Sequence, residues 1–330
     1  MIRGEYKTAR PLADQLLELA QQADDSVLLG SACFGLGVTM CWQGELTAAR
    51  EYCERALDLY DPARSKAYLA FSTQDMAVQA HYILAFCLWN LGFPDRALKQ
   101  AQEALALAER LSHPHSLGAA LHGLGLVYFW RGEWEANQQQ LERARALAQE
   151  NDLGDFVIWA TLEHDLARGF QIRSDAAVAQ VLESLEAVRA KGLGMTFTSW
   201  LTNVAELLGK SGQIAAGLDL IAEASAQIGL TGERFWEAEA WRVRGDLLLL
   251  REQQGNNSWE AETCYHKAIE IAQARNAKSL ELRATICLAR LQRRQGKPAE
   301  AQQLLREIYS WFTEGFYTSD LRNANALLTE

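Results

Sequence analysis

The amino-acid sequence predicts an all-α protein, a right-handed superhelix (α-solenoid) of about eight antiparallel helix pairs. Three observations support this prediction. Only five prolines occur in 330 residues, and the frequent residue types, Ala, Leu, Glu, Gln and Arg, favour helix. Glycines that follow apolar helical patterns recur about every 40 residues. Small residues lie at constant distances from those glycines, as in repeat proteins.

Glycine marks the turns of the predicted pairs, because it adopts the left-handed conformation that ends a helix at little cost. The turn glycines are Gly4, Gly44, Gly92, Gly132, Gly212 and Gly296. The last two intervals are about twice as long as the others. Two repeats therefore lack the glycine, and we expect them to turn near Arg173–Ser174 and near Asn256.

Small residues at fixed offsets predict how the two helices of a pair meet. Seven residues before the turn glycine stand Gly37, Ala85, Gly125, Ala205 and Ala289, and five residues after it stand Ala9, Ala49, Ala97, Gly217 and Ala301. Small side chains in mid-helix allow the partner helix to approach closely. Pro94 and Pro298 suit the first turn of a second helix, where a missing N–H costs nothing.

The expected elements follow from these markers. We expect a single domain over residues 1–330, with a lone second helix at 5–23, helix pairs near 26–60, 74–110, 114–150, 155–191, 196–229, 233–275 and 278–313, and a C-terminal capping helix at 319–329. The pair at 155–191 is degenerate, since its small residues fit the pattern only with a one-residue slip.

The pattern resembles the tetratricopeptide repeat over nearly the whole chain. Its clearest copy is Gly125-Leu126-Val127-Tyr128 followed by Gly132-Glu133-Trp134. The period of about 40 residues exceeds the usual 34 of this repeat class, which implies longer helices or loops.

The chain opens at a turn glycine, so the first helix of its first repeat is missing. The lone helix would leave Leu12, Leu16 and Leu19 uncovered, whereas solenoids normally end in a polar cap. We expect a fragment of a longer protein, and self-association through this end stays open.

Three segments carry a narrower resemblance. They are Arg3-Gly4-Glu5-Tyr6, the stretch from Gly232 to Glu239 leading into Arg244-Gly245-Asp246, and the stretch from Tyr309 to Phe316. They are similar to the C-terminal repeat region of large bacterial signalling proteins that combine a nucleotide-cyclase or kinase head with an ATPase. The resemblance implies a regulatory sensor arm without catalytic residues of its own. The alternative function is thus that of a C-terminal fragment of a multidomain bacterial adenylate or guanylate cyclase or signal-transduction ATPase.

Composition narrows the class of partner. The net charge of −10 argues against nucleic acid, which requires a basic footprint. No apolar signal core opens the chain, and the stretch Gly118–Trp130, interrupted by His122, is too short to cross a bilayer. Six cysteines without C-x-x-C spacing favour buried thiols and a reducing cytoplasm.

No motif predicts catalysis, a cofactor or a metal site. Gly209-Lys210-Ser211 resembles the end of a phosphate-binding loop, but Val204 stands where that loop needs glycine. His113-Pro114-His115 offers no third metal ligand at suitable spacing. We therefore expect a protein that is not an enzyme.

The candidate binding surface is the concave wall, which the first helix of each pair lines in repeats of this shape. The expected wall is aromatic in the N-terminal half, with Phe34, Val38, Trp42, Tyr82, Phe86, Trp89, Asn90, His122, Leu126, Phe129 and Trp130. It is charged in the C-terminal half, with Glu206, Arg242, Asp246, Arg283, Arg290, Arg293 and Arg294.

Aromatics and arginines are typical anchors of interfaces. The hypothesis is a partner protein or peptide in the groove, with apolar anchors on Trp42, Trp89, Phe129 and Trp130 and an acidic group near Arg283 and Arg290. Two alternatives stay open: several aromatics belong to the helix–helix core, or the arginines form a solvated face. Small-molecule sensing in the groove is a weaker third hypothesis.

Overall fold

The computed structural model describes residues 4–70, 72–251 and 258–329, and every regular element in these ranges is helical. The first half contains α1 (Tyr6–Ala23), α2 (Ser26–Gln43), α3 (Leu46–Asp58), the 3-10 turn η1 (Pro62–Arg64), α4 (Ser65–Tyr68), α5 (Met76–Asn90), α6 (Pro94–Leu111), α7 (Pro114–Arg131) and α8 (Trp134–Glu150). The second half contains α9 (Gly154–Ile172), α10 (Asp175–Ala190), α11 (Phe197–Lys210), α12 (Ile214–Thr231), α13 (Glu237–Arg251), α14 (Trp259–Ala274), α15 (Lys278–Arg294), α16 (Pro298–Tyr309) and α17 (Ser319–Thr329). The prediction of an all-α solenoid is confirmed.

The small residues of the repeat lie where the helices of a pair meet. A Cβ atom on Gly37 would stand 2.7 Å from the Sγ atom of Cys53, and one on Gly125 would stand 3.0 Å from Leu141. Ala49 and Ala97 are fully buried. The close approach expected from the sequence is therefore present in these pairs.

The turns follow the predicted chemistry. The turn glycines have positive φ angles, and Arg173 adopts the same left-handed conformation with φ 52° in the repeat that lacks glycine. The Ser174 hydroxyl then caps α10 by accepting a hydrogen bond from the Ala177 amide. Pro94 and Pro298 begin α6 and α16. The turn expected near Asn256 lies outside the described residues.

Helix α2 is apolar on nearly all sides. By length and composition it could cross a membrane, with a mean hydropathy of 1.3, and 61% of it is buried inside the structure. It packs against α1, α3 and α5. A helix enclosed in this way is apolar all round because each face contacts protein.

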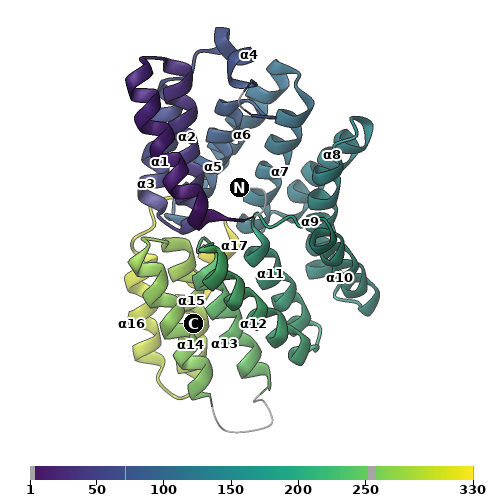
Figure 1. Cartoon of the computed structure of the whole chain (residues 1–330). Coiled ribbons are helices and arrows are strands. Elements are labelled where there is room, and N and C mark those ends of the chain that lie inside the picture. Colours follow the sequence, from purple (N-terminus) through teal and green to yellow (C-terminus); the bar gives the residue numbers. More distant parts are fainter. Residues whose placement is uncertain (1–3, 71, 252–257, 330) are drawn as a thin grey trace.

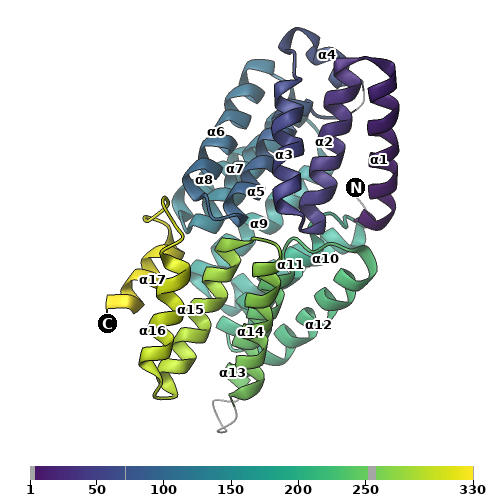
Figure 2. The ribbon, with the colours of Figure 1, turned by 90° about the vertical axis from the view of Figure 1, so that its left-hand side faces the viewer.

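The superhelix turns back on itself. Helices α1–α7 lie in the upper part of Figure 1 and α11–α16 in the lower part, with α8, α9 and α10 along one side. Figure 2 shows the same two layers from a view turned by 90°. We call α1–α8 the N-terminal layer and α11–α17 the C-terminal layer. One hydrophobic cluster contains buried residues of both layers.

Hydrogen bonds join the layers at the C-terminal ends of the upper helices. The Trp42 carbonyl, in the last turn of α2, accepts hydrogen bonds from the backbone amides of Arg234 and Phe235 at 2.7 and 3.1 Å. The Trp89 carbonyl accepts one from the Ser279 hydroxyl at 2.5 Å. The last carbonyls of a helix have no partner within it and carry partial negative charge, so the lower layer stabilises these ends.

The turn glycines of the N-terminal layer contact the loops of the C-terminal layer. A Cβ atom on Gly92 would lie 2.6 Å from the Trp311 ring and 2.8 Å from the Cβ atom of Lys278. One on Gly132 would lie 2.7 Å from Ser319. The equivalent glycines of the C-terminal layer, Gly212 and Gly296, have nothing within 4 Å of that position. The layers therefore meet closely at successive turns.

Candidate functional site

Most of the predicted aromatic wall is buried between the layers. Trp42, Phe86, Trp89 and Trp130 are each less than 5% exposed. Two aromatics of the loop before α13 cover them: Trp236 stacks on Trp89 and Trp130 at ring distances of 5.8 and 5.5 Å, and Phe235 lies 5.1 Å from Trp42. We call these six side chains the aromatic core.

The expectation of an open aromatic groove is therefore wrong for these four residues. The physical reason is that large aromatic side chains gain stability when they leave water, and the returning chain supplies aromatic rings that cover them. The alternative that they belong to the core is correct in this structure.

The other predicted residues of the N-terminal half are also largely enclosed. Phe34, Asn90 and His122 are buried. The side-chain amide of Asn90 donates to the Phe86 carbonyl, and Nε2 of His122 lies 2.8 Å from a Glu163 carboxylate oxygen. Tyr82 is half-buried and packs against Phe86. Their predicted role in contacting a partner is not supported by exposure.

An open cavity of about 310 Å³ lies where the two layers face each other on the inner wall. The first helix of several successive pairs contributes to it, as the repeat pattern predicts. We call it the inner-wall cavity. Its lining consists of Phe129, Gly132, Trp134, Phe170, Arg173, Asn203, Glu206, Lys210, Glu239, Arg242, Arg283, Ile286, Cys287, Arg290, Ser319, Asp320 and Asn323.

Three aromatic side chains form the apolar part of this lining. The Phe129 ring lies 5.4 Å from Trp134 and 5.8 Å from Phe170. Phe129 and Trp134 are half-buried. The Lys210 ammonium group stands 4.9 Å above the Phe170 ring, a cation–π arrangement. This part of the cavity suits an apolar or aromatic group.

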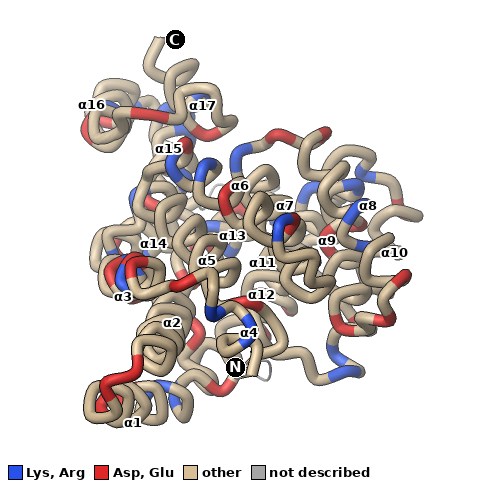
Figure 3. The backbone as a smooth tube through the Cα atoms, turned by 90° about the horizontal axis from the view of Figure 1, so that it is seen from above, with Lys and Arg blue, Asp and Glu red and all other residues tan. Residues whose placement is uncertain are grey.

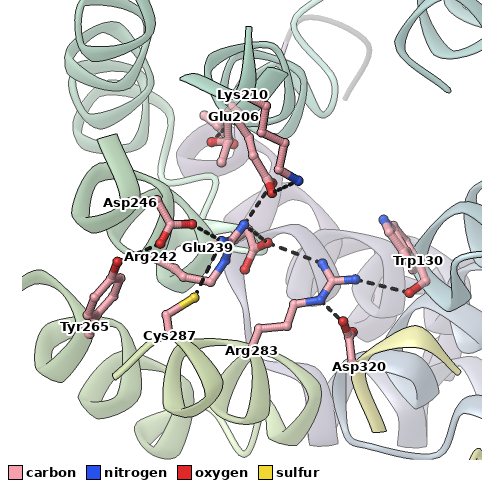
Figure 4. A network of polar contacts seen from close by, with 12 residues as sticks. Trp130, Glu206, Lys210, Glu239, Arg242, Asp246, Tyr265, Arg283, Cys287 and Asp320 are labelled. Atoms are coloured by element: carbon pink, nitrogen blue, oxygen red, sulfur yellow. Dashed lines mark hydrogen bonds and ion pairs between the residues drawn. The ribbon is translucent and has the colours of Figure 1, made fainter. Parts of the chain in front are cut away.

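An ion-pair network forms the floor (Figure 4). The Arg242 guanidinium donates to Glu206, Glu239 and Asp246 at 2.8, 2.8 and 2.5 Å. Arg283 donates to Asp320 at 2.7 Å and, across the layers, to the Trp130 carbonyl at 3.1 Å. Buried charges are stable only when they are paired in this way.

The charges of the network shift the pKa values of several of its members. Burial alone would raise the pKa of Glu206, but the charges of Arg242 and Lys210 outweigh it and hold that pKa well below its usual range. Burial would lower the pKa of Arg242, and the charges of Glu206, Glu239 and Asp246 raise it instead. Glu206 and Arg242 therefore stay ionised near neutral pH, whereas burial raises the pKa of Asp246 despite the charge of Arg242.

Two arginines of the lining have no carboxylate partner among the described residues. Arg173 and Arg290 are exposed, and the Arg173 guanidinium donates to the Phe170 carbonyl at 3.1 Å. The acidic residues of the lining, in contrast, all contact Arg242, Arg283 or Lys210. The cavity therefore carries an excess of positive charge in a protein whose net charge is −10.

The thiol of the lining is not activated. Cys287 is the thiol of the lining, and burial raises its pKa, so it stays protonated and is a weak nucleophile. The described residues contain no group of His, Cys, Asp and Glu side chains placed to hold a metal ion. Acidic and basic residues are otherwise interspersed along the chain (Figure 3).

The structure brings five predicted residues into this cavity, Phe129, Glu206, Arg242, Arg283 and Arg290, and Asp246 joins their network. Trp134, Phe170, Arg173 and Lys210 were missed. Phe170 stands three residues before the turn at Arg173, as Phe129 stands three before Gly132. The same offset applied to the degenerate repeat would have identified it.

Comparison with known proteins supports the repeat assignment. Residues 35–60 and 75–150 match tetratricopeptide-repeat families. An uncharacterized protein of Rhizobium meliloti (strain 1021) is 24% identical over 242 residues, which cover 73% of this chain and 23% of that protein. The chain therefore spans about a quarter of the length of this curated relative.

One solved structure shares the fold at low sequence identity, and a second resembles it less closely. Aspartyl phosphate phosphatase F from Bacillus subtilis aligns with 91% of this chain and 74% of its own, at 12% identity and a TM-score of 0.53. A Rap protein complexed with competence and sporulation factor aligns with 98% of this chain and 71% of its own, at 12% identity and a TM-score of 0.44. The chain thus carries tetratricopeptide repeats in an all-helical solenoid, a fold typical of protein-interaction scaffolds.

Proposed function

We propose that this protein is a non-catalytic interaction module that binds a segment of a partner protein in the inner-wall cavity. The observation that carries the proposal is the convergence, on one open cavity, of an aromatic wall and two arginines that have no carboxylate partner in the described part of the chain. Aromatic and arginine side chains supply most of the binding energy in typical interfaces. Concave surfaces are also the usual binding surfaces of solenoid proteins.

The proposal moves the binding surface away from the aromatic core. Trp89 and Trp130 are enclosed by Trp236, so a partner would have to separate the layers to reach them. The inner-wall cavity needs no such opening. Phe129 is half-buried and Arg290 is exposed in this cavity, so both predicted contact residues remain accessible there.

Affinity capture from cells that express the protein naturally tests this function. The Arg290→Glu variant should recover a bound partner at least about tenfold less than the wild-type chain, because reversing one interfacial charge costs more than 1.4 kcal/mol. Arg110→Glu is the matched control, since Arg110 is exposed on α6 outside the cavity. Equal recovery by both variants would contradict the proposal.

Self-association is a second candidate, favoured by one observation. Leu12, Leu16 and Leu19 of α1 are 60%, 42% and 63% exposed and lie on one helix face at i, i+4 and i+7. Exposed apolar patches of this kind mark interaction sites. Sedimentation should show a concentration-dependent dimer that the Leu16→Glu variant loses; a monomer at all concentrations would exclude this candidate.

We also propose that the module serves as the partner-binding arm of a longer signalling protein. The low coverage of the Rhizobium relative, 23% of its length, supports this idea. The mass of the native polypeptide, measured by immunoblot with an antibody against α17, tests it: a band near 36.8 kDa would contradict it.

A further inference from the structure

A second cavity adjoins the inner-wall cavity. It has a volume of about 210 Å³ and is lined mainly by apolar groups. We call it the leucine cavity, and its lining includes Glu206, Lys210, Asp246, Leu250 and Arg294. Glu206 and Lys210 line both cavities. Their ion pair, 2.7 Å long, is therefore the ridge between two neighbouring hollows.

The side chains beside this ridge leave positive charge unpaired. Arg290 and Arg294 stand one helical turn apart on α15, so they project from neighbouring positions on one face. Arg290 lines the first cavity and Arg294 the second, and both are exposed without a carboxylate partner among the described residues. The acidic groups nearby, Glu206 and Asp246, are already bound to Lys210 and Arg242.

We infer that the two cavities form one bipartite site for an extended, acidic segment of a partner protein. One aromatic or apolar side chain enters the inner-wall cavity beside Phe129 and Phe170, and a second apolar side chain enters the leucine cavity beside Leu250. An acidic residue between them lies over the ridge and pairs with Arg290 and Arg294. The inference rests on the proposed function and specifies its ligand.

Charge complementarity selects the acidic segment. The chain as a whole repels anions, with a net charge of −10, but beyond about 8 Å charges are largely screened at physiological salt. The local arginines therefore decide the sign of the ligand. A basic segment would place its cation beside Arg290 and Arg294 and would bring no partner for them, which makes its binding unfavourable.

An extended backbone fits two hollows separated by a ridge. Alternate side chains of an extended segment point to the same side, so two apolar side chains and an acidic side chain midway between them, each two residues from the next, can all face the wall. Pockets for alternate side chains give specificity in many peptide-binding sites. The apolar linings of the two cavities then select apolar flanking residues in the ligand, and Arg290 and Arg294 select an acidic residue between them.

Selection of displayed random peptides of about twelve residues tests the inference. The wild-type chain should enrich peptides with an acidic residue flanked by two apolar ones. The Arg290→Glu/Arg294→Glu variant should enrich basic residues at the middle position instead. The Leu250→Ala variant should lose the preference for an apolar residue on one side of the acidic residue only. The Phe170→Ala variant should lose that preference on the other side. Arg110→Glu should enrich the wild-type pattern.

A fluorescently labelled peptide from the enriched set is then used to measure binding affinities. Replacing its acidic residue with the isosteric amide should weaken binding at least about tenfold, and Leu250→Ala should weaken it by a similar factor. Circular dichroism confirms that each variant remains folded. The inference would be overturned, and the proposed function left intact, if the enriched peptides showed no preference for an acidic residue or if Leu250→Ala did not change their affinity. Failure of the wild-type chain to enrich any peptide would overturn both.

Discussion

At Gly92 and Gly132 two constraints act on the same residue. Each has a positive φ angle, 88° and 76°, which any L-residue adopts at a cost of roughly 1–2 kcal/mol. Each also lies against the opposite layer, where a Cβ atom would meet Trp311 or Ser319. The glycine at such a turn therefore ends a helix and also permits contact between the layers.

A matched pair of substitutions separates the two effects. Gly212→Ala and Gly296→Ala should each lower the free energy of unfolding by roughly 1–2 kcal/mol, the cost of the backbone conformation alone. Gly92→Ala and Gly132→Ala should lower it by a further 1–3 kcal/mol or so, because of overpacking. Urea unfolding followed by circular dichroism measures the difference. Equal losses at all four positions would show that the layers do not meet closely in solution.

Glu233 makes the contact between the layers sensitive to pH. It is 1% exposed in the loop before α13, and its carboxylate accepts one long hydrogen bond, 3.4 Å, from the Thr198 amide. Tyr6 of the N-terminal layer is its titratable neighbour. Burial raises the pKa of Glu233 from its ordinary value of 4.5 to about 7.

Between pH 4.5 and about 7, Glu233 therefore stays protonated in the folded chain, whereas it has lost its proton in the unfolded chain. Stability should fall as the pH rises from 4.5 towards 7 and should then level off. The Glu233→Gln variant, which carries no charge, should lose this contribution and exceed the wild-type stability at pH 8. Unfolding free energies at several pH values from 5 to 8, roughly the window set by the two pKa values, test this. Parallel profiles for the two proteins would contradict it.

At the scale of the element, α5 shows what local pattern can and cannot predict. Its apolar face and its turn at Gly92 follow from the spacing of small and apolar residues, and the structure has them. The same pattern points Trp89 inwards but does not say what it meets. Phe235 and Trp236, far away in the sequence, cover that side, and no periodicity relates them to α5.

Truncation of Trp89 should therefore destabilise the fold rather than remove a direct contact with a partner. Trp89→Ala should lower the free energy of unfolding by about 3–5 kcal/mol, as expected for a buried Trp. Trp259, on α14, is 59% exposed, so Trp259→Ala should change it by no more than about 0.5 kcal/mol. Thermal and urea unfolding give both values. If Trp89→Ala were as stable as the wild-type chain but failed to bind a partner, the prediction of an open aromatic groove would be supported instead.

The candidate site shows the same limit. Arg283 and Arg290 were found because the repeat at 278–313 is regular, whereas Phe170 was missed because its repeat lacks the glycine that sets the register. Arg173 replaces that glycine in the left-handed conformation, a role that non-glycine residues seldom take. A degenerate turn therefore hides a residue of the inner-wall cavity from the repeat pattern.

Over the whole molecule, a few loops hold the two layers together. The Trp236 side chain enters the aromatic core, and Glu314 accepts hydrogen bonds from the Asp95 and Arg96 amides at 3.0 Å, thereby capping α6 from the other layer. The repeat pattern predicts a curved array but not its pitch, which depends on small rotations summed over many pairs. The repeat pattern in the sequence therefore could not predict that the two layers touch.

Loss of these contacts should open the superhelix. The Trp236→Ala/Glu314→Ala variant should keep its helical content but show a larger radius of gyration than the wild-type chain, for which about 20 Å is expected of a compact protein of this length. Small-angle scattering measures the change, with Trp259→Ala as the control. An unchanged radius would mean that other contacts suffice to hold the layers together.

The alignment of successive turns with successive loops also bears on how this protein can evolve. Open repeat arrays gain or lose whole units by duplication and deletion, because each unit needs only its neighbours. Here an inserted unit between the layers would place Gly92 opposite a different loop and leave Trp89 without its cover. We therefore expect relatives to share the number of repeats between the layers and to vary in length only at the two ends of the array.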